Sequence, residues 1–189
     1  MRTHIAVLLL FQLLLCTGAK ADNIRRISSR EGISNNSVLS LAQGHDGYIW
    51  FGTCDGLDLW DGEKAVSYPS EDGGMLSLSG NLIEEIISTK DSLFWVRTNY
   101  GFDLFGPEGV RARHEEFQGI YFAASRNSYE TFVFAPGDEL YGYRPSTRDF
   151  VKTAWPGDFT FNDILDISIT DENVAWIFCR SGIYYAGIS

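Results

Sequence analysis

Polar and aromatic side chains that suit a hydroxyl-rich ligand follow three of the tryptophans in this 189-residue chain. They lie two to five residues beyond Trp50, Trp95 or Trp176, and the set comprises Asp55, Arg97, Asn99, Tyr100 and Arg180. Asn and Arg form directional hydrogen bonds, and Tyr adds a flat face on which a sugar ring can stack. We therefore treat these five as candidate ligand-binding residues. The competing interpretation is that they only complete turns or reach solvent.

Patterns typical of catalytic or metal-binding chemistry are missing from the sequence. His4 lies near the N-terminus, and His45 and His114 are solitary residues that we expect to be exposed in turns. No spacing matches a zinc or calcium site, and there is no G-x-S-x-G, P-loop or C-x-x-C motif. The adjacent carboxylates Glu84 and Glu85 would point to opposite faces of a strand, which argues against a cooperating pair. The sequence thus predicts no catalytic residue, no metal site and no cofactor.

The first 21 residues have the composition of a secretory signal peptide. Arg2 precedes an apolar run from Ile5 to Leu15, and Ala19-Lys20-Ala21 fits a cleavage site. The run is too short to be a permanent membrane helix. The formal net charge of −10, with no cluster of basic residues, disfavours a nucleic-acid partner. We therefore expect an exported, periplasmic domain at residues 22–189 that makes no membrane contact after cleavage.

An internal repeat positions the candidate residues. Ile33–Trp60 aligns without a gap to Leu78–Phe105 at an offset of 45 residues, and eight of the 28 positions are identical. A further clear copy lies at an offset of 126, and a degenerate copy in between has Phe132 in place of the tryptophan. Repeats of this length are typical of folds in which identical units stack on one another, because one unit cannot bury its own apolar faces.

Turn residues divide the first copy into four short strands. The expected strands are Val38–Ala42, Tyr48–Thr53, Leu57–Trp60 and Ala65–Tyr68. Four strands in about 45 residues is the size of a β-propeller blade. The sequence therefore predicts an all-β fold of about four antiparallel, four-stranded blades. We place them at residues 33–70, 78–117, 118–152 and 160–189, which together make a partial propeller at 22–189.

Residues that recur at fixed repeat positions are expected to be structural. The second-strand aromatic should pack between adjacent blades, because a ligand would not need it in every blade. The anchors are Trp50, Trp95, Phe132 and Trp176, with Gly56, Gly101 and Gly182 in the tight turns that follow. The recurring Asp58 and Asp103 are predicted to be structural polar groups and not acid catalysts. Cys54 and Cys179 fall in well-separated repeats, so we expect both to be free.

Three segments of the first copy carry a specific pattern. They are Gly32-Ile33-Ser34-Asn35-Asn36-Ser37-Val38, Asp46-Gly47-Tyr48-Ile49-Trp50-Phe51-Gly52-Thr53 and Asp55-Gly56-Leu57. This pattern resembles the two-component regulator propeller repeat. The second copy keeps the pattern but has Arg97 at the position of Gly52. The resemblance implies the N-terminal periplasmic sensor region of a hybrid two-component histidine kinase, in which seven-bladed propellers sense oligosaccharides.

On this resemblance the chain is part of a seven-bladed propeller that signals to a kinase outside it. The partners it implies are an oligosaccharide and either the rest of the sensor or a second copy of the chain. Two other functions stay open, a secreted propeller enzyme such as a lyase or hydrolase and a stand-alone protein-interaction propeller. A closed four-bladed ring is the alternative architecture, and it would use Ile24–Ser28 as the missing outer strand of the last blade.

Overall fold

The computed structural model describes residues 24–68, 77–170, 172 and 174–187. The expected signal peptide at residues 1–21 lies outside these ranges. Within them the regular structure is almost entirely β, with short 3-10 turns at Ser29–Glu31, Lys90–Ser92 and Phe161–Asp163. No helix in this part of the chain is long and apolar enough to cross a bilayer.

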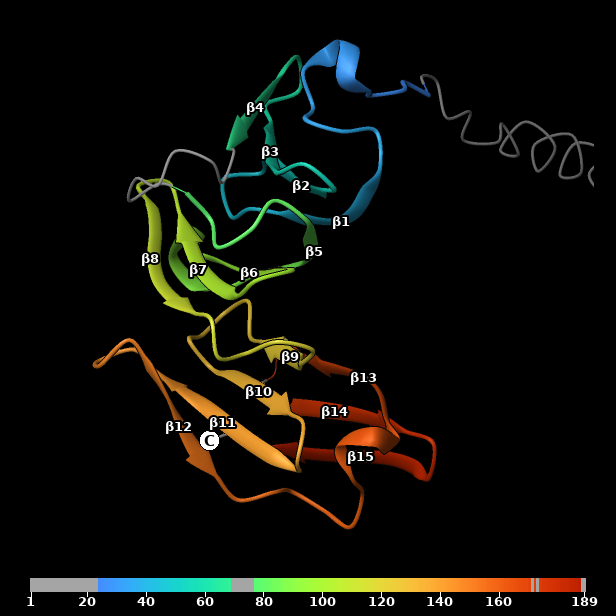
Figure 1. The fold of residues 1–189 in the computed structure, drawn as a ribbon, viewed down its shortest axis with the longest axis vertical. Helices are drawn as coiled ribbons and strands as arrows, with labels where there is room; N and C mark the ends of the chain where they lie inside the picture. Colours follow the sequence, from blue (N-terminus) through green and yellow to red (C-terminus); the bar gives the residue numbers. More distant parts are fainter. Residues whose placement is uncertain (1–23, 69–76, 171, 173, 188–189) are drawn as a thin grey trace, which may run out of the picture.

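The strands form four antiparallel sheets, each of which is one blade and each of which follows the order of the sequence (Figure 1). Blade 1 consists of β1 (Val38–Gln43), β2 (Ile49–Thr53), β3 (Leu57–Trp60) and β4 (Ala65–Tyr68). Blade 2 consists of β5 (Ile83–Ser88), β6 (Phe94–Thr98), β7 (Phe102–Gly106) and β8 (Gly109–His114). Blade 3 consists of β9 (Tyr121–Ala124), β10 (Thr131–Ala135), β11 (Glu139–Arg144) and β12 (Asp149–Thr153). In the described residues blade 4 has three strands, β13 (Ile164–Ile169), β14 (Val174–Cys179) and β15 (Gly182–Gly187).

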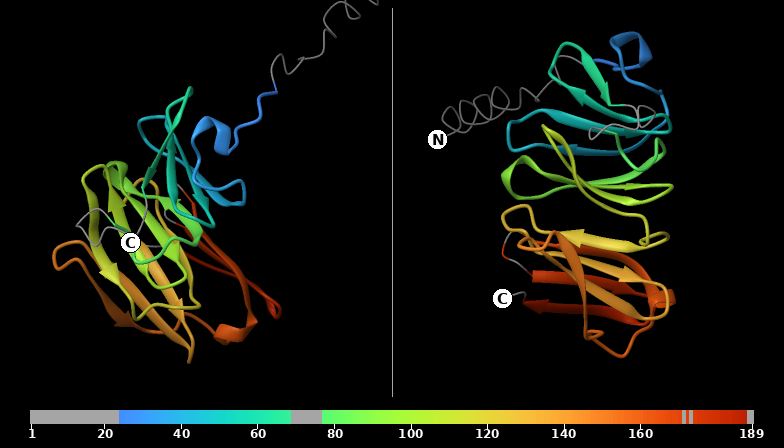
Figure 2. Two further views of the ribbon diagram at one scale, coloured as in Figure 1. Left: turned by 45° about the horizontal axis from the view of Figure 1, so that its top comes forward. Right: turned by 60° about the vertical axis from the view of Figure 1, so that its left-hand side comes forward.

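The blades stack one on the next, and the stack is open. The innermost strands β1, β5, β9 and β13 follow one another along its inner edge. Blade 1 lies at one end of the stack and blade 4 at the other (Figure 2). The prediction of an all-β propeller with about four blades is confirmed. The alternative of a closed four-bladed ring is not what the described residues show, since blade 1 and blade 4 lie at opposite ends of the stack (Figure 2).

The N-terminal segment differs from the expectation. Ile24–Ser28 does not form a strand. Instead, the Arg25 guanidinium lies 5.4 Å from the centre of the Trp60 ring and donates a hydrogen bond of 3.5 Å to the Gly62 carbonyl. The idea that this segment completes a blade was wrong, because its side chains contact blade 1 without continuing a strand ladder.

Glycine serves two purposes in the turns after the second strands. Gly56 and Gly182 adopt φ values of 148° and 154°, which side chains disfavour. At Gly101 the reason is space, because a Cβ atom there would lie 2.7 Å from the Ser79 hydroxyl oxygen. The recurring glycine is therefore required by backbone conformation in two blades and by close packing in another.

Apolar side chains fill the space between successive blades. The core between blades 1 and 2 surrounds Trp50, whose ring centre lies 5.0 Å from that of Phe94 and 5.4 Å from that of Phe105. The core between blades 2 and 3 surrounds Trp95, which stacks on Phe102 at 4.6 Å. These two tryptophans thus lie where the repeat placed them, between blades.

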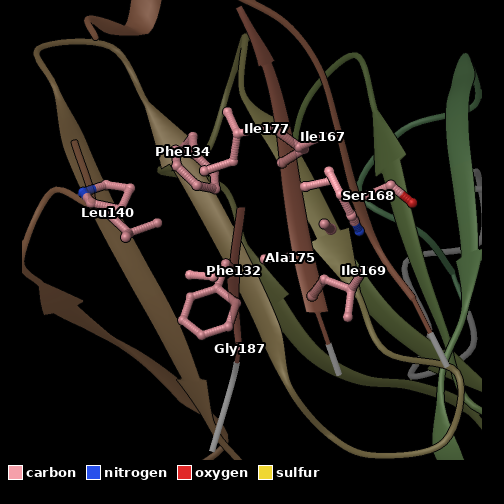
Figure 3. A pocket seen from close by; sticks show the side chains of 13 residues that line it. Phe132, Phe134, Leu140, Ile167, Ser168, Ile169, Ala175, Ile177 and Gly187 are labelled. Atoms are coloured by element: carbon pink, nitrogen blue, oxygen red, sulfur yellow. The ribbon is translucent and has the colours of Figure 1, made fainter. Parts of the chain in front are cut away.

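The last two anchors, Phe132 and Trp176, are each only half-buried. Phe132 is half-buried at the interface of blades 3 and 4. An apolar pocket of about 290 Å³ remains there, lined in part by Phe132, Phe134 and Ile177 (Figure 3). A phenylalanine opposite Gly142 occupies less space than the Trp–Leu pairs of blades 1 and 2. The degenerate copy therefore leaves a looser interface.

The recurring aspartates hold blades 1 and 2 to the segments that precede them. Asp58 accepts hydrogen bonds from the Ser34 backbone N–H at 3.0 and 3.1 Å and from its hydroxyl at 2.7 Å. Asp103 accepts hydrogen bonds from the Ser79 backbone N–H at 2.6 Å and from the Ser79 hydroxyl at 2.8 Å. Both aspartates are fully buried. The prediction that they are structural is confirmed, since their oxygens accept hydrogen bonds from backbone and serine donors and, at Asp103, from Arg113.

His114 is buried, contrary to the expectation of an exposed turn residue. Its side chain lies at the end of β8 and is only 6% exposed. The imidazole meets the Phe150 ring edge-on at 5.0 Å, and Nδ1 lies 3.0 Å from a Glu116 oxygen. Burial follows because the neighbouring blade covers the outer strand, which local sequence does not show.

His45 and the cysteines behave as expected. His45 is exposed, and its Nε2 lies 3.1 Å from the carbonyl oxygens of both Thr89 and Arg126, which belong to blades 2 and 3. Cys54 and Cys179 are both free thiols. Burial raises the pKa of the Cys179 thiol, so this side chain is a weak nucleophile.

Candidate ligand-binding groove

A polar hollow of about 550 Å³ lies beside the inner strands, and all four blades contribute to it. Its polar lining residues are Ser40, Glu84, Glu85, Arg97, Tyr121 and Asp166. We call this feature the inner groove. A second hollow of about 400 Å³ lies farther along the same inner strands, and its polar lining residues are Gln43, Ser88, Arg126 and Ser168. The inner groove is the richer in charged and aromatic groups.

Arg97 organises the inner groove. Its Nη1 lies 3.3 Å from a Glu84 oxygen and its Nη2 lies 3.4 Å from a Glu85 oxygen. Nη1 also donates a 3.2 Å hydrogen bond to the Ile120 carbonyl, which joins blade 2 to blade 3. The Nε atom is buried and has no hydrogen-bond partner among the described residues. The guanidinium therefore links two blades and keeps one polar atom without a partner.

A β-bulge brings Glu84 and Glu85 to the same guanidinium. The pairing of β5 with β6 shifts register between Ile83 and Glu85. In a regular strand the two side chains would lie on opposite faces, whereas an extra residue in one strand redirects them. The expectation that the two side chains point to opposite faces was wrong for this reason.

The bulge recurs in the repeat. The same register shift lies between Val38 and Ser40 in β1 and between Ile164 and Asp166 in β13. Ser40, Glu85 and Asp166 are equivalent in the repeat, at offsets of 45 and 126, and all three line the inner groove. A comparison of these equivalent positions in the sequence could have predicted the groove.

Glu85 lies in a setting that opposes its ionisation. Burial raises the pKa of its carboxyl group, Arg97 opposes this, and the nearby carboxylates of Asp166 and Glu84 raise the pKa further. In contrast, hydrogen bonds from Lys152 and Tyr141 lower the pKa of Glu139 on blade 3. The inner groove thus becomes less negative as the pH falls through the range in which Glu85 takes up its proton.

We expect Glu85 to protonate before Glu139 when the pH is lowered from 7. The two midpoints can be followed by carbon-detected NMR of the carboxyl groups. Because the folded chain binds this proton more tightly than the unfolded chain, Glu85 makes stability rise as the pH falls through its titration. Glu85→Gln should therefore gain more stability relative to wild type at pH 7 than at pH 4. A midpoint for Glu85 below that of Glu139 would contradict this assignment.

The structure places one of the five sequence candidates, Arg97, in the groove lining. The other four lie in turns between second and third strands, at the edge of the blades where the inner strands begin. Asp55 accepts a 2.8 Å hydrogen bond from Asn35, and Arg180 donates one of 2.7 Å to the Asn162 carbonyl. Asn99 and Tyr100 are exposed. Sequence reasoning missed Glu84, Glu85, Tyr121 and Asp166 as groove residues.

No group of three or more His, Cys, Asp or Glu side chains that could hold a metal ion occurs in the described residues. Two acidic members of the inner groove, Glu84 and Glu85, instead pair with the Arg97 guanidinium. An arrangement of carboxylates, a guanidinium and aromatic rings can donate and accept hydrogen bonds and offer a stacking face. This is chemistry for binding a polar, uncharged ligand.

Comparison with known proteins confirms the repeat in blade 1. Residues 32–55 match the family described as two component regulator propeller. No curated protein matches the chain.

Solved structures with the same fold include two extracellular domains from B. thetaiotaomicron. The domain of the putative hybrid two component system BT3049 is 19% identical with a TM-score of 0.60, and the match covers 86% of this chain and 25% of that one. The domain of the putative one component system BT4673 is 14% identical with a TM-score of 0.58, covering 87% and 26%. PorZ of Porphyromonas gingivalis, a surface component of the type-IX secretion system, is 12% identical with a TM-score of 0.66, covering 85% and 22%.

The chain spans about a quarter of the length of these structures. At such low identity the likeness concerns the fold. Together with the family match, it assigns the architecture of the stack and the kind of repeat from which blade 1 is built. The chain is a four-bladed propeller arrangement that carries a two-component regulator propeller repeat in its first blade.

Proposed function

We propose that this chain is a ligand-sensing part of a two-component sensor propeller. The observation that carries the proposal is the two-component regulator propeller repeat at residues 32–55, within a fold shared with the extracellular domains of a putative hybrid two component system and a putative one component system. In this proposal the chain is exported to the periplasm and binds an oligosaccharide. The bound state is passed to a kinase that lies outside these 189 residues.

The inner groove supports this proposal because its residues come from different blades. Arg97 belongs to blade 2, Tyr121 to blade 3 and Asp166 to blade 4. Tyr121 and Phe161 pack with ring centres 5.5 Å apart and add aromatic surface to the polar lining. A ligand held by all of them would favour one relative position of the blades, which is a means of transmitting its presence.

The carboxylates of the groove favour binding over catalysis. Both Glu84 and Glu85 lie within 3.4 Å of Arg97 nitrogens, so each carboxylate is engaged in an ion pair. A general acid or base would instead need to face the scissile bond with a pKa set for proton transfer. Hydrogen bonding to sugar hydroxyls needs no such proton transfer.

Isothermal titration calorimetry with a panel of neutral oligosaccharides tests the proposal. We expect at least one member of the panel to bind and Arg97→Ala to weaken its binding about 10-fold or more, the effect of losing a charged hydrogen-bond donor. Arg111→Ala is the matched control, because Arg111 lies on the outer strand of the same blade and pairs only with Glu108 among the described residues. Circular dichroism would verify that both variants fold.

Two results would contradict the proposal. One is a panel without binding to either the mature chain or the ectodomain of the longer protein. The other is an equal loss of affinity in Arg97→Ala and Arg111→Ala, which would place the ligand away from the inner groove. Asp166→Asn adds a second groove variant that leaves the Arg97 ion pairs intact.

A further inference from the structure

The second hollow differs from the inner groove in the sign of its charge. Among the described residues its lining holds one charged side chain, the guanidinium of Arg126, and no carboxylate. The lining of the inner groove holds three carboxylates and one guanidinium. Ile167 lines both hollows, so the two adjoin along β13. In a chain with a formal net charge of −10, a hollow with a positive lining is a local exception that favours an anion.

Arg126 is available to a ligand and is held in place by other blades. It is exposed in the turn after β9, and its side chain forms no ion pair or hydrogen bond with another described residue. The Nε2 atom of His45 lies 3.1 Å from the carbonyl oxygens of both Arg126 and Thr89. This contact ties the Arg126 backbone to blades 1 and 2, so the position of the residue is set before a ligand binds.

The aspartates of the neighbouring turns have partners of their own. Asp46 accepts a 3.1 Å hydrogen bond from the Tyr48 N–H, and Asp91 accepts one from the Tyr129 hydroxyl. Neither aspartate forms an ion pair with Arg126. The positive charge of the second hollow is therefore not paired within the described chain.

A buried hydroxyl in the same lining lacks a partner as well. Ser88, the last residue of β5, is only 9% exposed, and its Oγ has no hydrogen-bond partner among the described residues. A buried polar group without a partner is destabilising and rare, and a ligand that accepts its hydrogen bond accounts for it. Ser168 on β13 adds an exposed hydroxyl to the lining. Guanidinium and hydroxyl groups are donors suited to the oxygens of a carboxylate or sulfate.

We propose that the second hollow binds an anionic group, a carboxylate or sulfate, of the oligosaccharide whose uncharged part occupies the inner groove. Arg126 pairs with the anion, and Ser88 and Ser168 donate hydrogen bonds to its oxygens. The opposite charges of the two adjoining hollows then fix the direction in which the ligand lies. The identity of the ligand as an oligosaccharide rests on the proposed function, whereas the anion site rests only on the lining of the second hollow.

Isothermal titration calorimetry at low ionic strength tests the proposal with pairs of oligosaccharides that differ only in one uronate in place of a neutral sugar. We expect the uronate-bearing member to bind the mature chain about 5-fold more tightly, as for an exposed ion pair. Arg126→Gln should remove this advantage and leave the affinity for the neutral member unchanged. Arg144→Gln is the matched control, because Arg144 is an exposed arginine of the same blade, on the third strand β11 and outside the lining of both hollows.

Ser88→Ala separates a binding role from a structural one. We expect it to reduce the advantage of the uronate-bearing member and to leave the urea midpoint of the free chain unchanged or raised, because the hydroxyl has no partner to lose. Thr89→Val is the contrasting variant, since the buried Thr89 hydroxyl lies 3.0 Å from the carbonyl oxygens of Ser125 and Ser128 and its loss should lower the midpoint. An equal loss of stability in both variants would contradict the role of Ser88.

Inorganic sulfate distinguishes a failure of this proposal from a failure of the proposed function. Followed by NMR of the backbone amides, sulfate alone should shift the signals of Ser88 and Arg126 whether or not any oligosaccharide binds. It should also compete with the uronate-bearing member and not with the neutral one. Three results would overturn the proposal: no preference for the uronate-bearing member, a preference that survives Arg126→Gln, or sulfate that binds in the hollow without competing with the oligosaccharide.

Discussion

Trp95→Ala is expected to lower the free energy of unfolding by about 3–5 kcal/mol, the range for removing a large buried aromatic. The side chain is 1% exposed and lies between blades 2 and 3. Its ring contacts Phe102 and meets Tyr143 edge-on at 4.9 Å, and its Nε1 donates a 2.8 Å hydrogen bond to the Thr131 hydroxyl. Truncation would leave a cavity and remove the donor to the buried Thr131 hydroxyl, which would keep only its 3.4 Å hydrogen bond to the Tyr129 carbonyl.

Trp176→Ala is the matched control for this substitution. It removes the same residue type at the same repeat position, but from a half-buried face that no other blade of the described residues covers. We expect a loss below about 1 kcal/mol, as is usual for surface positions. Urea denaturation followed by circular dichroism, at concentrations where the chain is monomeric, would measure both values. Equal losses in the two variants would show that Trp95 does not hold blades 2 and 3 together.

Asp103→Ala is expected to cost about 2–4 kcal/mol, because it removes the acceptor of several buried or half-buried donors. Asp103 is 0% exposed and accepts hydrogen bonds from the Ser79 N–H, the Ser79 hydroxyl and Arg113 Nε. The Ser79 N–H would be left without its partner. The Arg113 side chain is 38% exposed, so water can replace part of its interaction.

Two further variants serve as controls for Asp103→Ala. They are Asp46→Ala and Asp103→Asn. Asp46 is exposed and accepts one hydrogen bond from the Tyr48 N–H, so its removal should cost less than about 1 kcal/mol. Asp103→Asn keeps a carbonyl acceptor but loses the charge, and its cost should fall between the two. Denaturation midpoints in urea would rank the three variants. If Asp103→Ala is no more costly than Asp46→Ala, the aspartate does not hold the blade to its preceding segment.

Much of the fold could be predicted from local signals. The expected strands of the first copy differ from β1 to β4 by at most one residue at any end. Turn residues mark the strand ends, and the gap-free offset of 45 transfers the pattern to blade 2. The same offset correctly placed Trp50 and Trp95 between blades and indicated that Asp58 and Asp103 are structural polar groups. Repetition compensates for the weakness of any single strand signal.

The inner groove was harder to predict, because it depends on irregular backbone and on several blades at once. Arg97 was identified from its residue type and position alone. Its partners Glu84 and Glu85 were not, since a bulge in β5 reverses the alternation from which their directions were inferred. Tyr121 and Asp166 come from other blades, and only stacking brings them to the same hollow.

The sequence by itself determined the unit and the number of units: all-β blades, four of them, each with an aromatic anchor and most with a buried aspartate or a turn glycine. Only the tertiary structure decided which of these equivalent residues is covered. Trp95 and Trp176 carry the same signal in the repeat, yet one is buried and the other lies half-exposed on the open face of blade 4. Local chemistry forms a strand and directs its side chains, whereas burial requires a neighbouring blade, and neighbours are set by the arrangement of the whole stack.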